Sequence, residues 1–464
     1  MAVATSRRVF LQLAAAGLAA ATAGGCARLT GRDIPGRGSG ALVVSLLGTS
    51  ADAAARQALL SGFRAEHPGI EVVLQPIQAT DWGDFFAKIL TQVAAGTPPD
   101  IVYVATEGTQ LFAEQLAVPL DDYVRRDAGE LAEFFADVHP ALVESMMYQG
   151  SLFEIPIEFN AANMYFNTGL LRQAGADVPP ADWTVDDFVA LMRAEQAAGG
   201  GGFLPYYWTN RLWGGVVPWL YANGTNLLTE SRAPGGQWLW ERFYDADTAR
   251  QRGGGTVYGD PLATADHTVE TFEFLAQLIA NGLSSRPEEG GGNTLIGLFS
   301  GGRIGSTPAG GFWAGGLHDG GMAPDAFDVQ FSPRWRTQRH QFGAAGYAIM
   351  RTARDVDAAW EFVKYAARRE SMEAVMAANQ TTPARRSMLT ADRYAATGPR
   401  NWQVFYDTVD RFPDTGPIPA PAQAAAVQSA VLKHVGTALS APGNVRASLA
   451  AMQADLDTVM GTRS

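Results

Sequence analysis

Residues 41–104 alternate between short apolar runs and amphipathic stretches. The apolar runs are 41–48, 70–74 and 100–104, and the amphipathic stretches between them run from Ser50 to about His67 and over 84–95. Nearly continuous apolar runs of this length are typical of strands buried on both faces of a parallel sheet. Strand, helix, strand, helix, strand is a βαβαβ unit, so the sequence predicts the α/β fold class.

The loops after the first and third predicted strands mark a candidate site. Ligands of parallel α/β sheets lie outside the carboxyl ends of the strands. Residues 48–50 follow the first of these strands and residues 105–107 follow the third. We therefore expect Ser50 and Glu107 to face a bound molecule.

A leader precedes this unit and ends at Cys26, the only cysteine of the chain. Arg7 and Arg8 form a basic head, residues 9–25 are apolar and uncharged, and small residues lead up to Cys26. This pattern predicts a secretory signal over residues 1–26, and the apolar run is shorter than the ~20 residues of a membrane helix. The alternative is a buried free cysteine within the fold.

The leader resembles two export motifs of bacteria. SRRVFL at residues 6–11 is similar to the twin-arginine motif, and AGGC at 23–26 resembles a lipobox, in which the cysteine is lipidated and becomes the N-terminus. The resemblance implies lipid attachment at Cys26, followed by a flexible tether over residues 27–41. Several acyl chains on one residue anchor a protein stably. We expect an extracytoplasmic protein on the cell membrane, in the periplasm or on the outer face.

Charge and cysteine content exclude some partners. The 464 residues carry a net charge of −12, and no basic block follows the leader, so nucleic acid is not an expected partner. No disulfide can form once Cys26 is lipidated, so the cores alone must stabilise the fold. The length predicts two or three domains.

Local signatures of catalysis and metal binding are missing from the sequence. There is no G-x-S-x-G elbow, P-loop or H-E-x-x-H motif, and the six histidines have no ligand spacing. The glycines at 36–40 and 290–292 are typical of linkers or turns, and the acidic pairs at 121–122 and 186–187 are typical of helix starts. We predict no catalytic residue, no metal and no cofactor.

Six motifs in order resemble those of the extracellular solute-binding proteins of bacterial ABC importers. They are HPGIEV at 67–72, AAGTPPDIV at 94–102, LDDY at 120–123, ANG at 222–224, AAWEFVK at 358–364 and PARRS at 383–387. The most similar group is sugar-binding family 1, which is maltose-binding-protein-like, and the resemblance spans about residues 42–440. It implies a two-lobed class II fold of the periplasmic-binding-protein type, with a hinge and a ligand cleft between the lobes.

The resemblance also implies the domain boundaries. Crossings between lobes are expected near 155–157, 330–332 and 381–383. The predicted N-lobe comprises 42–157 plus about 331–380, and the predicted C-lobe comprises 158–330 plus 381–464. Independently, the residues at 342–350 predict a strand and those at 356–367 an amphipathic helix.

A ligand set follows from the same resemblance. Trp313 is expected to stack on a sugar ring, Glu107 and Asn160 to bond its hydroxyls, and Arg385 to bond a hydroxyl or a carboxylate. Tyr206 and Trp219 belong to an aromatic-rich wall. The full set of predicted ligand-binding residues is Ser50, Trp82, Glu107, Asn160, Tyr206, Trp219, Trp313, Gly346 and Arg385.

Two departures from the family pattern concern aromatic side chains. Relatives often carry a tryptophan in the strand that here contains Gly343 and Gly346, and others carry an aromatic where this chain has 423–426. The departures leave open a different sugar size or a ligand that is not a sugar.

The predicted function is that of a monomeric, lipid-anchored receptor that captures a sugar or oligosaccharide between two lobes. The resemblance implies delivery to a permease pair driven by a cytoplasmic ATPase. Two rival functions remain open. One is an extracytoplasmic carbohydrate-active hydrolase, in which Glu107 and Glu158 would form the carboxyl pair. The other is a purely structural surface lipoprotein.

Overall fold

The computed structural model describes residues 40–287, 292–376 and 381–461. The predicted signal, the predicted lipid-attachment residue Cys26, nearly all of the predicted tether and Gly290–Gly291 lie outside the described residues. By their mutual contacts, residues 36–464 form one compact unit.

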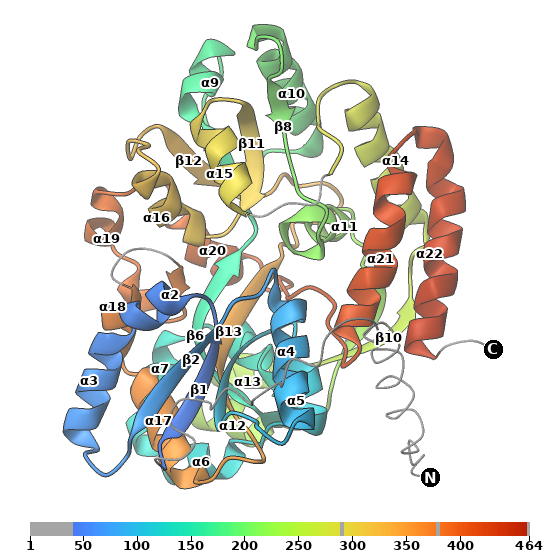
Figure 1. Cartoon of the computed structure of the whole chain (residues 1–464). Helices are drawn as coiled ribbons and strands as arrows, with labels where there is room; N and C mark the ends of the chain where they lie inside the picture. The colour runs from blue at the N-terminus through green and yellow to red at the C-terminus, as the bar shows by residue number, and fades with distance from the viewer. Residues whose placement is uncertain (1–39, 288–291, 377–380, 462–464) are drawn as a thin grey trace, which may run out of the picture. The chain divides into compact units, whose positions relative to one another are not determined.

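Six strands form the first sheet, in the order β14-β6-β13-β3-β1-β2 (Figure 1). β1 runs parallel to β2 and β3, so the predicted βαβαβ unit is confirmed. β13 is antiparallel to β3 and β6, and β14 is antiparallel to β6. The strands of this sheet are β1 (Leu42–Leu47), β2 (Val72–Ile77), β3 (Ile101–Ala105), β6 (Glu154–Ala161), β13 (Phe342–Ile349) and β14 (Thr382–Pro383).

Helices cover both faces of this sheet, and the strand residues alternate between two hydrophobic cores. Tyr103 points into a core with Phe63 and Trp360, whereas Val102, on the opposite face of the sheet, belongs to a core with Phe112. We call this sheet and its helices the first lobe. Its helices are α2 (Ser50–Ala55), α3 (Gln57–Glu66), α4 (Trp82–Ala94), α5 (Thr109–Gln115), α6 (Asp121–Arg126), α7 (Ala128–Asp137), α8 (Pro140–Glu144), α17 (Val356–Ala366) and α18 (Arg369–Met376).

Four strands form the second sheet, in the order β12-β7-β11-β8. β7 is antiparallel to β12 and β11, and β11 is parallel to β8. We call this sheet and its helices the second lobe. Its strands are β7 (Asn163–Asn167), β8 (Leu204–Tyr206), β11 (Ile304–Ala309) and β12 (Phe327–Gln330).

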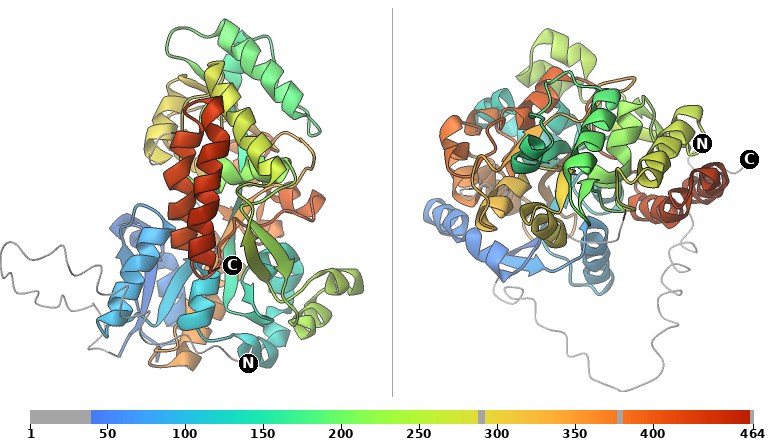
Figure 2. Two further views of the ribbon diagram at one scale, coloured as in Figure 1. Left: turned by 90° about the vertical axis from the view of Figure 1, so that its right-hand side faces the viewer. Right: turned by 90° about the horizontal axis from the view of Figure 1, so that it is seen from above.

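The helices of the second lobe include a long antiparallel pair near the C-terminus, α21 and α22, which lie side by side in Figure 2. The helical elements of this lobe, with the kinked turn η1 (Leu212–Val216), are α9 (Thr168–Gln173), α10 (Val185–Ala198), α11 (Val217–Ala222), α14 (Asp266–Ala280), α15 (Gly292–Ser300), α16 (Phe312–Asp319), α21 (Ala424–Ala438), η3 (Pro442–Asn444) and α22 (Val445–Met460).

The remaining elements connect these parts. They are the β4–β5 hairpin (Met147–Tyr148, Ser151–Leu152), the ribbon of β9 (Leu228–Arg232) and β10 (Thr256–Pro261) with α12 (Gln237–Phe243) and α13 (Ala246–Gln251) between its strands, and η2 (Arg386–Met388), α19 (Ala391–Ala395) and α20 (Val404–Arg411).

Two predicted lobe boundaries differ from the sheets that the strands form. The boundary at 157/158 falls inside β6, which pairs with β13 up to Ala161, so the chain leaves the first sheet at Ala162. Residue 381 does not open the second lobe, because β14 at Thr382–Pro383 adds to the first sheet and α20 contacts β6. The backbone hydrogen bonds between β6 and its neighbours β13 and β14 set both boundaries. These pairings join residues that are far apart in sequence, so local sequence does not reveal them.

The segment between β9 and β10 also departs from the prediction, since it packs on the first lobe. Phe243 stacks on Phe135 of α7 with ring centroids 4.2 Å apart. The buried Glu144 of α8 pairs with Arg252 at 2.9 Å and accepts the backbone N–H of Gly253 at 2.7 Å. A side chain on Gly254 would collide with Gly150, so the two backbones touch. Residues 233–255 therefore dock on the first lobe, although the flanking chain belongs to the second.

The Glu144→Gln variant is expected to destabilise this docking. It leaves the nearly buried Arg252 guanidinium without a counter-ion, and breaking such a pair costs about 3 kcal/mol of unfolding free energy. Denaturant titration measures this loss. The control is Asp247→Asn, which removes an exposed pair with Arg250 and should change stability by less than ~0.5 kcal/mol. Equal effects of the two variants would contradict the importance of the buried pair.

A second buried carboxyl, on Glu195 of α10, has no hydrogen-bond partner in the described part of the chain. It faces β11 at Gly305, where any side chain would collide with the carboxyl group. Burial raises the pKa of Glu195 to about 8. The folded protein therefore keeps this carboxyl protonated at neutral pH, while the unfolded chain releases the proton near the ordinary glutamate pKa of 4.5.

Glu195 should make stability fall as pH rises. Between pH ~4.5 and ~8 the folded state binds one more proton at this site than the unfolded state, so each pH unit costs up to about 1.4 kcal/mol. The Glu195→Gln variant is expected to lose this slope, and the exposed Glu241→Gln control should keep it. Unfolding free energies measured across this pH range provide the test, and an unchanged slope in Glu195→Gln would refute the assignment.

The described residues contain no helix that is both long and apolar enough to span a membrane.

Candidate functional site

The side chain of Asn160, near the end of β6, joins the two lobes. Its Oδ1 accepts the backbone N–H of Phe312 at 3.2 Å, at the start of α16 in the second lobe. Its Nδ2 donates to Oγ1 of Thr381 at 3.0 Å, just before β14. All three residues are half-buried. One amide therefore fixes three chain segments that are more than 60 residues apart in sequence.

Trp213 extends this junction from the second lobe. Its ring centroid lies 5.7 Å from that of Phe312. A Cβ on Gly343 of β13 would lie 3.0 Å from the indole Nε1, so the indole reaches the bare backbone of the first lobe. The next residue, Gly214, has a φ of 67° and donates its N–H to Oε1 of Gln341 at 2.8 Å. Trp213 is half-buried, which leaves part of its ring accessible.

Two further glycines allow the close approach at this junction. A Cβ on Gly310 would lie 2.7 Å from Cβ of Asn160, and a Cβ on Gly311 would collide with Oγ1 of Thr382. A side chain at either position would push α16 away from β6 and β14. The two glycines before Phe312 therefore allow the start of α16 to pack directly against β6 and β14.

The first-lobe side of the junction carries a polar and aromatic wall. Burial raises the pKa of the Glu158 carboxyl, while the Thr381 hydroxyl, Arg56 and Tyr103 oppose this shift. Burial also raises the pKa of Tyr103 well above its usual value. The rings of Tyr103 and Tyr347 lie 4.9 Å apart. This wall brings a carboxyl group, a guanidinium and phenol hydroxyls together; Glu158 and Arg56 are partly exposed, whereas Tyr103 and Tyr347 are buried.

Glu107 lies next to this wall, directly after β3. Its Oε2 accepts from Oγ1 of Thr106 at 3.2 Å, and that hydroxyl lies 3.7 Å from a Cβ position on Gly343. Burial raises the pKa of Glu107, and the charge of Asp81 raises it further. Trp82 also faces the wall, with its ring centroid 6.3 Å from that of Tyr103. A partly desolvated carboxyl and an indole thus border the same region.

The structure brings together three of the predicted ligand-binding residues, Trp82, Glu107 and Asn160, through the contacts above. Ser50 lies at the exposed start of α2, six residues before Arg56. The remaining five predicted residues lie elsewhere.

Three predicted aromatic contacts are core residues. Trp313 is 1 % exposed and packs edge-on against Tyr165 and Phe299. Trp219 is 3 % exposed and donates its Nε1–H to the hydroxyl of Tyr206, which is also buried. No ring face of these residues is open to a ligand, so the predicted stacking role is corrected. In α16 the neighbouring Phe312 takes the position at the junction, because adjacent helix residues point about 100° apart.

Gly346 and Arg385 are buried and contact other parts of the protein. Gly346 is buried where β13 bulges against β6, and a side chain there would collide with the carbonyl of Ile155. Arg385 is buried against α7, where Nη1 lies 3.3 Å from Glu133 and 3.4 Å from Asp137. The predicted hydroxyl or carboxylate contact of Arg385 is therefore replaced by two intramolecular carboxylates.

Sequence reasoning missed several residues of the site. They are Arg56, Tyr103, Arg211, Trp213, Phe312 and Tyr347. A signal for Trp213 and Arg211 exists in the sequence WTNRLWGG at 208–215, where polar residues separate two tryptophans before a Gly-Gly turn. No local pattern marks Tyr103 or Tyr347, since each sits inside an otherwise apolar strand.

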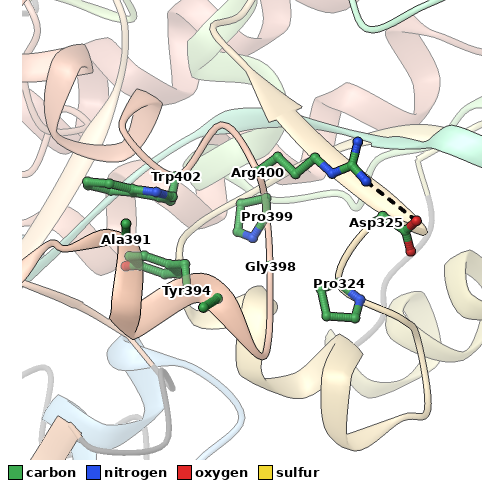
Figure 3. Close-up of a pocket in the computed structure, with 9 residues that line it drawn as sticks. Pro324, Asp325, Ala391, Tyr394, Gly398, Pro399, Arg400 and Trp402 are labelled. Atoms are coloured by element: carbon green, nitrogen blue, oxygen red, sulfur yellow. Dashed lines mark ion pairs between the residues drawn. The ribbon is translucent and has the colours of Figure 1, made fainter.

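A separate pocket of about 450 Å³ opens beside α19 (Figure 3). Its lining includes Trp402, stacked on Tyr394 with centroids 5.6 Å apart, and Arg400, paired with Asp325 at 3.5 Å. It contains no predicted ligand-binding residue. The described residues also contain no group of three or more His, Cys, Asp or Glu side chains arranged to hold a metal ion.

Solved structures with the same fold are numerous. An ABC substrate-binding protein of Listeria monocytogenes, in complex with cycloalternan, aligns with a TM-score of 0.71 at 17 % identity over 90 % of this chain and 98 % of that one. The GacH receptor of Streptomyces glaucescens, solved with acarbose, aligns with a TM-score of 0.68 at 18 % identity, over 91 % of this chain and 100 % of that one. The Thermus thermophilus maltotriose-binding protein aligns with a TM-score of 0.67 at 16 % identity, over 90 % of this chain and 100 % of that one. These likenesses confirm the predicted two-lobed α/β fold.

A family model described as bacterial extracellular solute-binding protein matches residues 48–373, which is more than half of the chain. The match begins just after β1 and ends within α18, so it includes strands of both sheets. The family expected from the sequence motifs is thereby confirmed. The chain belongs to the bacterial extracellular solute-binding proteins.

Proposed function

We propose that this protein is a receptor that captures a sugar or oligosaccharide between its two lobes and delivers it to an ABC importer. The single observation that carries the proposal is the junction at Asn160, where Trp213 and Phe312 of the second lobe meet a polar wall of the first. Aromatic rings beside carboxyl, guanidinium and hydroxyl groups suit a sugar ring, which has apolar faces and a polar rim. The oligosaccharides bound by the structural relatives support the same class of ligand.

Capture requires a hinge, and the segments that cross between the sheets supply it. Ala162 donates its N–H to the carbonyl of Gln341 at 2.8 Å, so two crossings are bonded side by side. Gly416, near a third crossing, pairs with Gln341 as well. A change of a few torsions there moves one lobe against the other. The ligand must bind the closed form more tightly than the open form for closure to report occupancy.

The importer and the membrane anchor are parts of the same proposal. The extracellular family supports a location outside the cytoplasm. The leader motifs support lipidation at Cys26, and the family supports docking of the closed form on a permease pair with a cytoplasmic ATPase. We propose a monomeric receptor that holds its ligand without altering it.

Binding of a saccharide is the central test. Isothermal titration calorimetry of the full-length protein, purified in detergent, against mono-, di- and oligosaccharides should detect binding of at least one of them. The bound saccharide should be recovered chemically unchanged. The Trp213→Ala variant should weaken binding by about tenfold through lost stacking. Trp402→Ala is the matched control, because this tryptophan lies in the separate pocket, and it should bind as the wild type does.

Three results would count against the proposal. Cleavage of the saccharide during incubation would favour a hydrolase that uses Glu107 and Glu158. Binding only by polyamines, amino acids or glycerol phosphates would keep a transport role and remove the sugar assignment. Equal affinities of Trp213→Ala and the wild type would show that the ligand lies away from the junction.

Anchoring is tested by the Cys26→Ala variant. Without the thiol no acyl chain can be attached, so the protein should move from the membrane fraction to the soluble fraction of fractionated cells. A Thr22→Ala variant, which keeps the cysteine, serves as the control and should remain with the membranes. Membrane retention of Cys26→Ala would argue against the lipobox interpretation.

A further inference from the structure

Arg211 stands beside the proposed site without a carboxylate partner among the residues that the structure describes. Its guanidinium carbon lies 5.4 Å from the ring centroid of Trp213, and Nη2 lies 3.5 Å from a Cβ position on Gly214. Other poorly exposed arginines of the chain behave differently, since Arg252 pairs with Glu144 and Arg385 with two carboxylates. Arg211 is thus a desolvated cation whose charge nothing in the described chain neutralises.

Further N–H donors around the same turn lack acceptors. Buried and unpaired within the described chain are the donors Nε1 of Trp208, Nε of Arg211 and Nε2 of Gln341, and Oγ1 of Thr209 and Oδ1 of Asn210 are unpaired there as well. The ring of Trp208 lies 3.3 Å from a Cβ position on Gly215, and Gln341 bonds Gly214 through its other amide atom, so all three residues border the turn 212–216. A buried donor without an acceptor is unfavourable, because it has lost its hydrogen bonds to water. No acceptor of the described chain bonds these three donors.

A carboxylate meets these requirements best. Its two oxygens match the planar fork of a guanidinium in a bidentate pair, which is stronger than a hydrogen bond to a hydroxyl. Burial lowers the pKa of Arg211 to about 10, so the group still carries its charge at neutral pH. The chain as a whole has a net charge of −12, so attraction for an anion at this site is local.

We infer that the ligand is an acidic saccharide whose carboxylate pairs with Arg211, as in a sugar chain that contains a uronic acid. The inference rests on the proposed function and narrows its substrate class. The uronate ring lies against Trp213, and its carboxylate points to the second lobe. Its hydroxyls face the first-lobe wall, where Glu107 and Glu158 accept hydrogen bonds. This arrangement separates the ligand's charge from the carboxyl groups of the protein.

The test compares acids with their neutral counterparts. Di- and trisaccharides of galacturonic and glucuronic acid are titrated into the full-length protein in detergent, each beside its methyl ester, together with neutral oligosaccharides. We expect at least one acid to bind about 30-fold or more tightly than its ester. The Arg211→Gln variant should bind that acid as weakly as the ester, and Arg211→Lys should recover part of the affinity. Arg193→Gln, exposed on α10, is the control and should bind as the wild type does.

Each outcome is decisive. Esters or neutral oligosaccharides that bind as tightly as the acids, or more tightly, overturn the inference and leave the proposed receptor function intact. An acid preference that persists in Arg211→Gln overturns the role of Arg211. Binding of no saccharide at all overturns the proposed function and the inference together. Thermal midpoints of the variants, compared with the wild type, distinguish a lost contact from a lost fold.

Discussion

The amide of Asn160 holds together the region on which the proposed function depends. It receives a backbone N–H from α16 of the second lobe and donates to a hydroxyl next to β14 of the first. The approach is close because Gly310 and Gly311 present no side chains to it. A small set of backbone contacts thus sets the distance between Trp213 and the wall around Glu158. The accessible aromatic and polar groups lie together for this reason.

A second constraint comes from residues 233–255. This segment leaves the second lobe on one strand of the β9–β10 ribbon and returns on the other, while α12 contacts α7, and Arg252 and Gly253 contact Glu144 of α8. The docking combines the stacked rings of Phe135 and Phe243 with the buried carboxylate of Glu144. Any hinge motion must bend the ribbon or its ends. The connection between the lobes therefore includes more than the crossings next to the sheets.

Local sequence predicted the secondary structure correctly where hydrophobic periodicity determines it. The strand at 342–349 and the helix at 356–366 follow from the spacing of apolar residues. Thr184 and Asp187 form a capping box at the start of α10, in agreement with the helix-start interpretation of Asp187. The site residues were predicted less well. Trp313 occupies the core and Phe312 the junction, a difference of one residue that depends on where α16 begins.

The sequence by itself determined the α/β class, the βαβαβ unit and the family, because hydrophobic periodicity and ordered motifs are properties of adjacent residues. It also determined that Glu107 directly follows a strand. Only the tertiary structure decided that Arg385 pairs with two carboxylates, whereas Arg211 has no carboxylate partner among the described residues, since the partners of Arg385 are distant in the chain. The same holds for the docking of 233–255. Long-range packing selects which of many similar side chains remain accessible, and no local pattern encodes that selection.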